Sequence, residues 1–577
     1  MKSIRSFIPA LEWMRAYSEQ QFRGDLVAGL TVGVMLIPQG MAYAMIAGLP
    51  PIFGLYASTL PILIYAFLGT SKQLAVGPVA MVSLLTATGI GVFAEGGTEA
   101  YILLAITLAF LVGAIQFLLG LFRLGFLVNF LSHPVISGFT SAAALIIGLS
   151  QLKHLLGIDL ARSHHVHEIV IQAIERIGET SLPTLGIGLA GIALIVGIKK
   201  LKKSIPGPLL AVAFGILAVY LFGLTEHGVK IVGSVPSGLP SFSTPDFSMD
   251  TFGKLIPVAL AIALVSFMES IAVAKAIQAR HKNYKVDANQ ELIALGLANL
   301  GGSFLQSYPV TGGFSRTAVN DQSGAKTGMA SIISVLLIVL TLLFLTPLFY
   351  YLPKAILASV IMVAVFGLID YKEAVHLWKT DQSDFWMLII TFVATLGLGI
   401  EQGIAIGVVL SLAWIIYRTS KPHMTKLGQV EGTHFYRNVE RFQQVKERKE
   451  LLIIRFDAQL YFANIAYFKD QIEEWVKEKG DQLQTVIINA DSINNLDSSA
   501  VHALEDIVEQ LRSNQLQVFF TGVKGPVRDI MAKSHLTEKI GERNFFMSVQ
   551  EAVDCHDSTC TNNGNPVYRA FVLQSNL

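Results

Sequence analysis

Two apolar stretches of the sequence are each interrupted by a short segment rich in Gly and Pro. These segments are residues 76–78 (Val-Gly-Pro) and 311–316 (Thr-Gly-Gly-Phe-Ser-Arg). An interruption frees the backbone N–H groups at the start of the helix that follows, and the positive end of such a helix attracts anions. Breaking a helix in lipid is costly unless the freed groups face protein or water. Gly and Pro also occur in membrane helices as packing or kink residues, so one break alone would mean little.

The pairing of two such breaks predicts one anion site between two half-helices. The residues expected to border it are Val76, Gly77, Pro78, Phe314, Ser315 and Arg316. Arg316 lies within one helical turn of the second break, and a charge at membrane depth is expensive and tends to be functional. Its forked donors could hold an oxyanion. The alternative is a structural arginine that reaches a lipid headgroup or pairs with Asp321.

Glu269 lies in the middle of another apolar stretch, between Met268 and Ile271. Apolar surroundings disfavour the charged form of a carboxyl group, so Glu269 could exchange a proton during transport. A carboxyl group beside an anion site is expected to be protonated when the anion binds, which favours proton–anion symport. The alternative is a static ion pair with Lys275 or Arg316.

Gln39 and Tyr43 lie one helical turn apart in the first apolar stretch and therefore share a helix face. Both could donate hydrogen bonds to anion oxygens. The alternative for this pair is packing between helices, with the amide satisfied by a neighbouring helix.

Fourteen apolar spans are predicted to position these residues. Charged residues make up 15% of the 577 residues, against roughly 25% in soluble domains, and about 20 apolar residues can cross a bilayer. The predicted spans are 25–47, 52–69, 76–93, 100–121, 125–152, 181–199, 206–224, 252–277, 288–306, 312–322, 327–350, 354–370, 384–399 and 402–418. Lys and Arg gather in alternate loops, which predicts that both termini lie in the cytoplasm.

The two halves of this membrane part resemble each other. A polar residue followed by small residues recurs in the first span (38–44) and in the eighth (268–274), and each half contains one broken span. Each half has seven spans, which is an odd number, so the second half enters the membrane with the opposite orientation to the first. Broken segments at matching positions of inverted repeats indicate a transporter site. The predicted fold is a polytopic α-helical membrane protein of fourteen spans, arranged as a seven-plus-seven inverted repeat.

Beyond about residue 420 the composition becomes that of a soluble domain. Strands are predicted at 451–456, 485–490 and 518–520, with amphipathic helices near 464–478 and 498–513. This order predicts a small α/β domain. Asp497 and Ser498 lie between a strand and a helix, where they could cap the helix. A phosphate on Ser498 would meet the positive helix end, so this pair is also a candidate regulatory site.

The sequence offers little basis for other chemistries. No nucleophile–base pair, phosphate loop or metal cluster is evident, which argues against an enzyme. A net charge of +1 does not suggest a nucleic-acid partner. The two cysteines, Cys555 and Cys560, lack the further ligands that a zinc site needs, and His164, His165 and His167 suggest a solvated loop. We expect no metal and no cofactor.

Three segments resemble the SulP family of anion transporters. They are residues 51–72, which match the family signature except at Phe53, where Tyr is usual, and residues 37–44 and 313–320. The C-terminal domain is similar to a STAS domain, including the loop at 497–499. The resemblance covers nearly the whole chain.

The resemblance implies a core domain of spans 1–4 and 8–11 and a gate domain of spans 5–7 and 12–14. It also implies an anion held between the third and tenth half-helices, an elevator-like movement of the core, and a homodimer. Spans 8 and 10 are most similar to those of proton-coupled sulfate transporters, which implies coupling by Glu269 and anion binding by Ser315 and Arg316. Sodium-coupled bicarbonate members resemble the chain less at Glu269.

We therefore expect a secondary transporter that carries sulfate with protons across the cell membrane. The alternatives are sodium-coupled bicarbonate transport, C4-dicarboxylate transport, an uncoupled exchanger or channel, and an anion sensor. Expected partners are the anion, a proton or sodium ion, membrane lipids, a second copy of the chain and a cytoplasmic partner of the STAS-like domain. The expected organisation is an amphipathic segment (1–23), a membrane domain (24–420), a linker (421–434), the STAS-like domain (435–555) and a polar tail (556–577).

Overall fold

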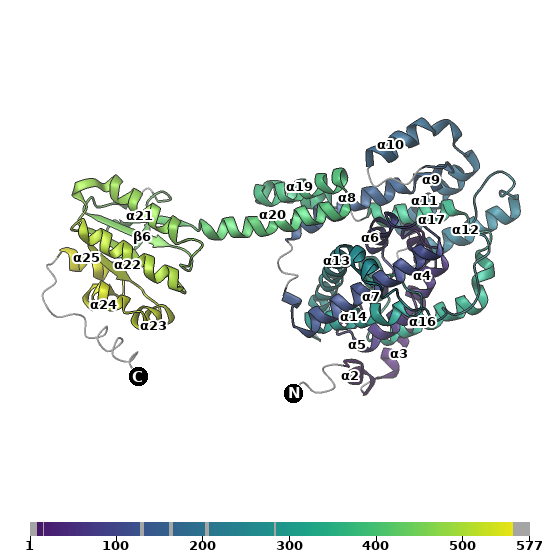
Figure 1. The fold of residues 1–577 in the computed structure, drawn as a ribbon, viewed down its shortest axis with the longest axis horizontal. Helices are drawn as coiled ribbons and strands as arrows, with labels where there is room; N and C mark the ends of the chain where they lie inside the picture. The colour runs from purple at the N-terminus through teal and green to yellow at the C-terminus, as the bar shows by residue number, and fades with distance from the viewer. Residues whose placement is uncertain are drawn as a thin grey trace. The chain divides into compact units, whose positions relative to one another are not determined.

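The computed structural model describes residues 8–15, 17–126, 132–160, 166–201, 207–281, 284–367, 369–442 and 444–557. The chain divides into two compact units, Met1–Ser411 and Leu412–Leu577 (Figure 1). The predicted tail beyond Asp557, together with His164 and His165, lies outside the described residues.

The first unit is built of helices. They are α2 (Ala10–Arg15), α3 (Glu19–Ile46), α4 (Ile52–Tyr56), α5 (Leu60–Leu68), α6 (Ala80–Gly91), α7 (Glu99–Leu121), α8 (His133–Ser150), α9 (Leu152–Leu156), α10 (Val166–Glu175), α11 (Leu182–Leu201), α12 (Gly207–Phe222), α13 (Met249–His281), α14 (Ala288–Ser303), α15 (Phe314–Gln322), α16 (Met329–Leu340), α17 (Lys354–Phe366), α18 (Tyr371–Thr380), α19 (Gln382–Leu398) and α20 (Ile400–Ser420), the last of which runs into the second unit.

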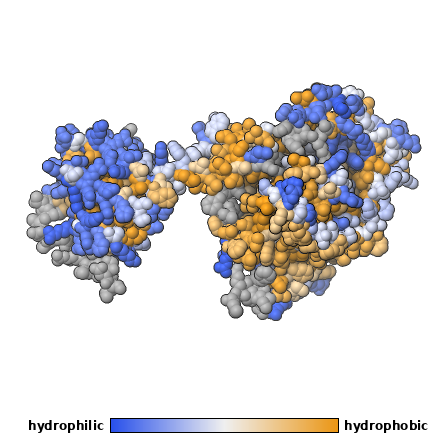
Figure 2. Space-filling view, viewed as in Figure 1, coloured by the Kyte–Doolittle hydropathy of each residue, from blue (hydrophilic) through white to orange (hydrophobic). Residues whose placement is uncertain are grey.

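A helix lies in each of the fourteen predicted spans. Within the described ranges, seven helices are long and apolar enough to cross a membrane by length and composition, and five shorter helices are also apolar. Figure 2 shows apolar residues over much of the visible surface of this unit, as a surface in contact with lipid requires. The number of crossings stays a prediction.

The first long helix begins earlier than the sequence suggested. Ser18 caps α3, because its hydroxyl accepts the amide of Gln21 while the Gln21 side chain accepts the amide of Ser18. This reciprocal capping box fixes the start of the helix. Arg23, predicted to end the separate amphipathic segment 1–23, is therefore part of α3, where it pairs with Glu19.

The helices of the first unit form two packed groups. In one group α14 packs on α7 and α5, α16 packs on α3, and α13 packs on α7 and α6. In the other group α19 packs on α8, and α17 packs on α11, α12, α8 and α9. The groups meet where α3 packs on α17 and α12, and where α6 packs on α8. This division matches the core and gate domains that the family resemblance implies.

The second unit is a small α/β domain around one sheet. Its strands are β3 (Met424–Val430), β4 (Tyr436–Asn438), β5 (Val445–Lys446), β6 (Leu451–Phe456), β7 (Thr485–Asn489), β8 (Gln517–Thr521) and β9 (Phe545–Phe546). Its remaining helices are α21 (Ile465–Lys479), α22 (Ser498–Ser513), α23 (Gly525–Lys533), α24 (Leu536–Ile540) and α25 (Val549–Asp557). The strand order is β4-β3-β6-β7-β8-β9, with β5 also paired to β3.

The central strands β6, β7 and β8 are parallel, as the alternation of strands and helices predicts. Alternate residues of each strand face opposite sides of the sheet. Ile454 and Ile488 pack with α21 and α22 on one side, whereas Ile453 and Ile487 pack with α25 on the other. The antiparallel strand β3 lies within the stretch predicted as a linker, so the sheet begins before residue 435.

Candidate functional site

The two predicted helix breaks meet inside the first unit. They form β1 (Val76–Gly77) and β2 (Thr311–Gly312), which pair antiparallel, with Val76 opposite Gly312 and Gly77 opposite Thr311. α6 begins three residues after Gly77, and α15 begins two residues after Gly312. The pairing therefore brings the N-terminal ends of the two half-helices to one place.

Further hydrogen bonds tie the start of α15 to Ala75, the residue before β1. The amide of Gly313 donates to the carbonyl of Ala75 (3.1 Å). The amide of Ala75 donates to the hydroxyl of Thr317 in α15 (3.0 Å). Thr317 and Ala75 are both buried, so these bonds are shielded from water and hold the start of α15 against β1.

Helix α13 is bonded directly to β2. The Ser270 hydroxyl accepts the amide of Gly312 (2.8 Å) and shares a hydrogen bond with the Thr311 hydroxyl (2.7 Å). The Thr311 hydroxyl also donates to the carbonyl of Ser266 (2.7 Å). Because Ser270 already occupies the Gly312 amide, this amide is not a donor for a bound anion. Glu269, which precedes Ser270, is held beside the junction.

A buried amide network supports the segment that leads into β2. Asn299 of α14 accepts the amide of Val310 (2.8 Å) and donates to its carbonyl (3.1 Å). Asn299 also donates to Gln116 of α7 (3.1 Å), and Gln116 donates to the Ser266 hydroxyl (2.7 Å). The network joins three helices of the core group, so the broken segment has a fixed backbone path.

The first turns of both half-helices leave backbone donors available. An α-helix has no internal partner for its first amides, and neither α6 nor α15 has a side chain that caps it. Both helix ends carry partial positive charge. Two such ends at one β-bridge form a site suited to an anion.

Arg316 lies at the junction and is almost completely buried, with 1% of its surface exposed. Its Nη1 donates to the carbonyl of Pro78 on the opposite half, while Nε and Nη2 have no hydrogen-bond partner among the described residues. No carboxylate of the described residues lies within ion-pair distance of the Arg316 guanidinium. Asp321, the predicted alternative partner, instead pairs with His281 and Arg280. A buried cation without a counter-ion is costly, which indicates that an anion belongs here.

Glycine is required where the backbone approaches this guanidinium. Gly77 has a φ of +145°, which side chains rarely adopt, and a Cβ there would lie 3.4 Å from Nη2 of Arg316. A Cβ on Gly313 would lie 3.1 Å from the same atom. The two glycines thus give Arg316 room between the half-helices.

Glu269 is close to this guanidinium without being paired to it. The two groups interact electrostatically, yet Oε2 of Glu269 is buried without a hydrogen-bond partner in the described part of the chain. The static ion pair with Lys275 or Arg316, the sequence-based alternative, is not formed. Taken as a whole residue, Glu269 is only partly buried.

Gln39 and Tyr43 lie on one face of α3, as their spacing predicts, and both are buried. Oε1 of Gln39 has no partner among the described residues, so the packing alternative with a satisfied amide does not hold. Tyr43 interacts electrostatically with Arg316 and Glu269. Phe314 and Ser315, in contrast, are exposed at the start of α15, so the site is open on their side.

The structure places the predicted residues of the two breaks at one junction with Tyr43 and Glu269, and it places Gln39 on the same helix, α3, as Tyr43. It also adds several residues that support this junction and that the sequence analysis missed. The added residues are Ser266, Ser270, Gln116, Asn299, Thr311 and Thr317. Their common signal was available, because each is a polar residue within a predicted apolar span or at its break. Sequence alone does not say which of the many Ser and Thr residues in such spans share hydrogen bonds.

In the second unit, Asp497 is the N-cap of α22, as predicted. Its carboxylate accepts the amides of Ala500 (2.8 Å) and Phe462 (2.9 Å), and Ser498 is the first residue of the helix. Capping alone accounts for Asp497. The regulatory role of Ser498 stays a prediction.

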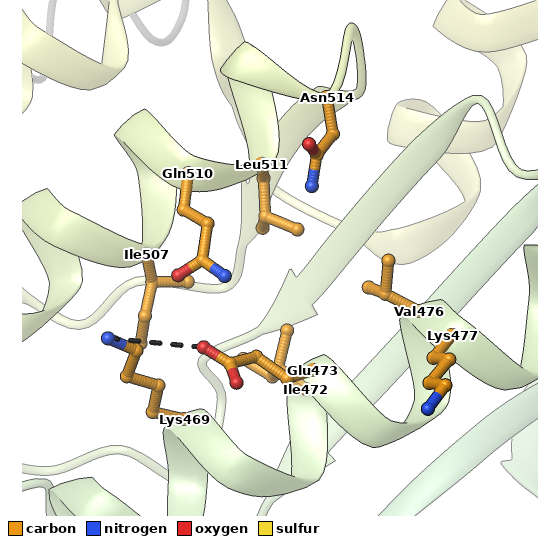
Figure 3. Close-up of a pocket in the computed structure, with 9 residues that line it drawn as sticks. All are labelled: Lys469, Ile472, Glu473, Val476, Lys477, Ile507, Gln510, Leu511 and Asn514. Carbon is orange, nitrogen blue, oxygen red and sulfur yellow. Dashed lines mark ion pairs between the residues drawn. The ribbon is translucent and has the colours of Figure 1, made fainter.

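A groove lies between α21 and α22, with a volume of about 280 Å³. Figure 3 shows its apolar side chains, among them Ile472, Val476 and Leu511, and a charged rim on which Lys469 and Glu473 pair at 3.9 Å. None of the predicted site residues lies in it. It is a feature of the second unit.

A membrane-embedded helical unit with two broken helices joined at a buried arginine defines the class of the protein: a polytopic transporter of anions. Comparison with known proteins gives the family. The Sulfate permease family matches residues 22–391, and the STAS domain matches residues 443–552. This chain belongs to the sulfate permease family and carries a C-terminal STAS domain.

Curated relatives match along almost the whole chain. "Sulfate transporter 4.1, chloroplastic" from Arabidopsis thaliana is 40% identical over 568 residues, which cover 95% of this chain and 82% of the relative. "High affinity sulfate transporter 2" from Stylosanthes hamata is 36% identical over 571 residues, which cover 95% and 86%.

Solved structures show the same fold. Murine solute carrier 26 family member A9, an anion transporter in the inward-facing state, has a TM-score of 0.88 at 26% identity, covering 96% of this chain and 94% of that one. The transmembrane domain of the cyanobacterial bicarbonate transporter BicA has a TM-score of 0.59 at 20% identity, covering 68% and 98%. The BicA match shows the fold alone.

Proposed function

We propose that this protein carries sulfate together with protons across a membrane, by movement of the core helices against the gate helices. The observation that carries the proposal is the buried guanidinium of Arg316, which lies between two uncapped helix ends and whose Nε and Nη2 have no partner among the described residues. The surplus of N–H donors fits an anion rich in oxygen atoms. The names of the curated relatives support sulfate as that anion.

Proton coupling is supported by the position of Glu269. Its carboxyl group faces the same site as Arg316 without forming an ion pair. When protonated, Glu269 leaves the positive charge of Arg316 to the anion; when it is charged, the two negative groups compete for that guanidinium. Binding of the proton therefore favours binding of the anion, which is the requirement for symport.

Movement of the core against the gate is supported by the packing. All binding residues lie on α3, α6, α13 and α15 or at their breaks, and these belong to the core group. The site can thus move as one body while the hydrogen bonds between β1, β2 and α13 stay intact. A homodimer in the cell membrane with cytoplasmic termini remains part of the proposal.

Uptake of labelled sulfate into liposomes with an imposed pH gradient or sodium gradient tests the function. We expect accumulation driven by an inward proton gradient and no effect of sodium. Accumulation of bicarbonate or of a C4-dicarboxylate in place of sulfate would assign another substrate. Accumulation driven by a sodium gradient would refute the proposed coupling to protons. Binding without movement of the label would indicate a sensor.

The same assay tests Glu269. We expect Glu269→Gln to abolish accumulation against a sulfate gradient while sulfate–sulfate exchange persists, because the amide keeps the size of the side chain but cannot exchange a proton. Accumulation by this variant at the wild-type level would show that coupling lies elsewhere. Glu95→Gln, at an exposed site, is the matched control and should accumulate normally.

A further inference from the structure

Tyr308 lies directly before the broken segment and plays no part in the site as described so far. Its side chain is 1% exposed. It interacts electrostatically with both Arg316 and Tyr43, which places it in the same cluster of groups as the anion site. The segment that carries it is held by the Asn299 network through Val310.

Among the described residues, the Tyr308 hydroxyl bonds only to another hydroxyl, that of Ser83 (3.2 Å). Ser83 is completely buried and lies in the first turn of α6, the half-helix that begins at Ala80. The contact therefore joins the second broken segment to the first half-helix, on the same junction as Arg316.

Two hydroxyl groups carry two protons, and one hydrogen bond between them uses only one. Neither oxygen has another hydrogen bond in the described part of the chain. One buried hydroxyl proton is therefore left without an acceptor, and such a group is expensive unless something binds it. Either hydroxyl can be the donor in this contact. With Ser83 as the donor to the phenol oxygen, the spare proton is the phenolic one, on the side chain that interacts electrostatically with Arg316 and Tyr43.

Resting on the proposed function, we propose that Tyr308 is a further anion-binding residue that donates its phenolic hydrogen to an oxygen of the bound oxyanion, with Ser83 as its positioning residue. The site then presents neutral O–H donors besides the guanidinium. A tetrahedral dianion has enough oxygen atoms to accept from all of them, whereas chloride lacks separate acceptor atoms. Tyr308 thus contributes to the preference for an oxyanion over a halide.

Titration of purified full-length protein with sulfate and with chloride, followed by uptake in liposomes, tests this role. We expect Tyr308→Phe to weaken sulfate binding about tenfold, the size of one lost hydrogen bond to a charged group, while chloride binding changes less than twofold and maximal uptake is retained. Ser83→Ala should weaken sulfate binding by a smaller factor, about threefold, because the phenol keeps its proton but loses its orientation.

Tyr101→Phe is the matched control, since the Tyr101 hydroxyl is also buried but donates to the carbonyl of Ala47 (2.6 Å). We expect it to lower the melting temperature without changing sulfate affinity. Unchanged sulfate affinity in Tyr308→Phe, or equal weakening of sulfate and chloride, would overturn the role of Tyr308. If Tyr308→Phe does not fold, an unchanged affinity in Ser83→Ala overturns it instead.

The wild-type protein separates this inference from the proposed function. Failure of the wild type to bind sulfate would refute the proposed function, and the variants would then be titrated with whichever anion of the uptake panel it does bind. Tyr308 is assigned to the site only if its phenylalanine variant loses affinity for that anion while Tyr101→Phe does not.

Discussion

At the scale of single residues, the site is organised around one buried cation, Arg316, which has more N–H donors than hydrogen-bond acceptors around it. Arg316 uses Nη1 to join the two halves and keeps Nε and Nη2 unpaired among the described residues. Glu269 and Gln39 each contribute a buried oxygen without a partner in the same part of the chain. Such groups are rare in folded proteins because they are costly, so the occurrence of Arg316 and Glu269 at one junction supports the proposed binding site.

Arg316→Ala removes this cation and should weaken sulfate binding at least about 30-fold, which corresponds to about 2 kcal/mol for one partner of a buried charge pair. Equilibrium titration of purified protein measures the change. Arg280→Ala removes an arginine at the end of α13 that is largely exposed, with 63% of its side chain accessible, and should leave affinity within twofold. Wild-type affinity in Arg316→Ala would remove this residue from the site.

At the scale of elements, buried carboxylates hold the loops that flank the broken helices. Glu291 of α14 accepts four hydrogen bonds: from the Tyr65 hydroxyl, from the amide and hydroxyl of Thr70, and from the amide of Ser71. Asp25 of α3 accepts the amides of Lys326 and Thr327 and the Thr327 hydroxyl. One carboxylate thus anchors the loop before β1, and the other anchors the loop after α15.

Glu291→Gln should destabilise the first unit by about 1–3 kcal/mol, because the amide places a donor where the carboxylate accepted one and leaves a buried group unsatisfied. A lower melting temperature in detergent is the expected result. Glu95→Gln, at an exposed loop position, should melt with the wild type. If Glu291→Gln and Glu95→Gln have the same melting temperature, the Glu291 carboxylate does not anchor this loop.

At the scale of the whole molecule, the chain consists of two units with separate hydrophobic cores. In the second unit, Arg448 donates to both carboxylate oxygens of Asp557 (2.8 and 2.6 Å). This bond ties the end of α25 to the start of β6. It also lowers the pKa of the Asp557 carboxyl, chiefly through the hydrogen bonds from Arg448.

A group whose pKa is lowered by folding stabilises the folded state above its unfolded pKa, which is about 3.9 for Asp. That contribution is lost as the pH falls through the folded value. Both side chains are partly exposed, at 34% and 47%, so the bond should contribute less than about 1 kcal/mol. The stability of the second unit should therefore depend weakly on Asp557 at neutral pH and not at all in strong acid.

Asp557→Asn should thus lower the free energy of unfolding of the second unit at pH 7 and converge with the wild type as the pH falls below about 4. Hydrogen exchange of peptides from β6, β7 and β8 in the full-length protein measures this unit by itself. Asp470→Asn, at an exposed position, should follow the wild type at every pH. A difference that persists or grows in acid would contradict the assigned role of Arg448.

The sequence by itself determined the elements and the class of protein. Apolar spans, the β-α-β-α order and the two breaks depend on local composition, which is why β6, β7, β8, α21 and α22 lie where they were predicted within a residue or two. Candidate site residues could also be identified from the sequence, because charged residues and helix breaks are unusual within apolar spans.

Only the tertiary structure decided which groups meet. The pairing of β1 with β2 joins segments more than 230 residues apart. The roles of Thr317 and Tyr308 depend on partners from the other half of the chain, and Ser270 depends on Gly312, which lies 42 residues further along. Ser and Thr are common in membrane helices, so type and spacing do not reveal such partners. Whether Arg316 would pair with Asp321 was likewise a question of packing, because helix α13 brings His281 and Arg280 to Asp321 and leaves the guanidinium without an ion pair among the described residues.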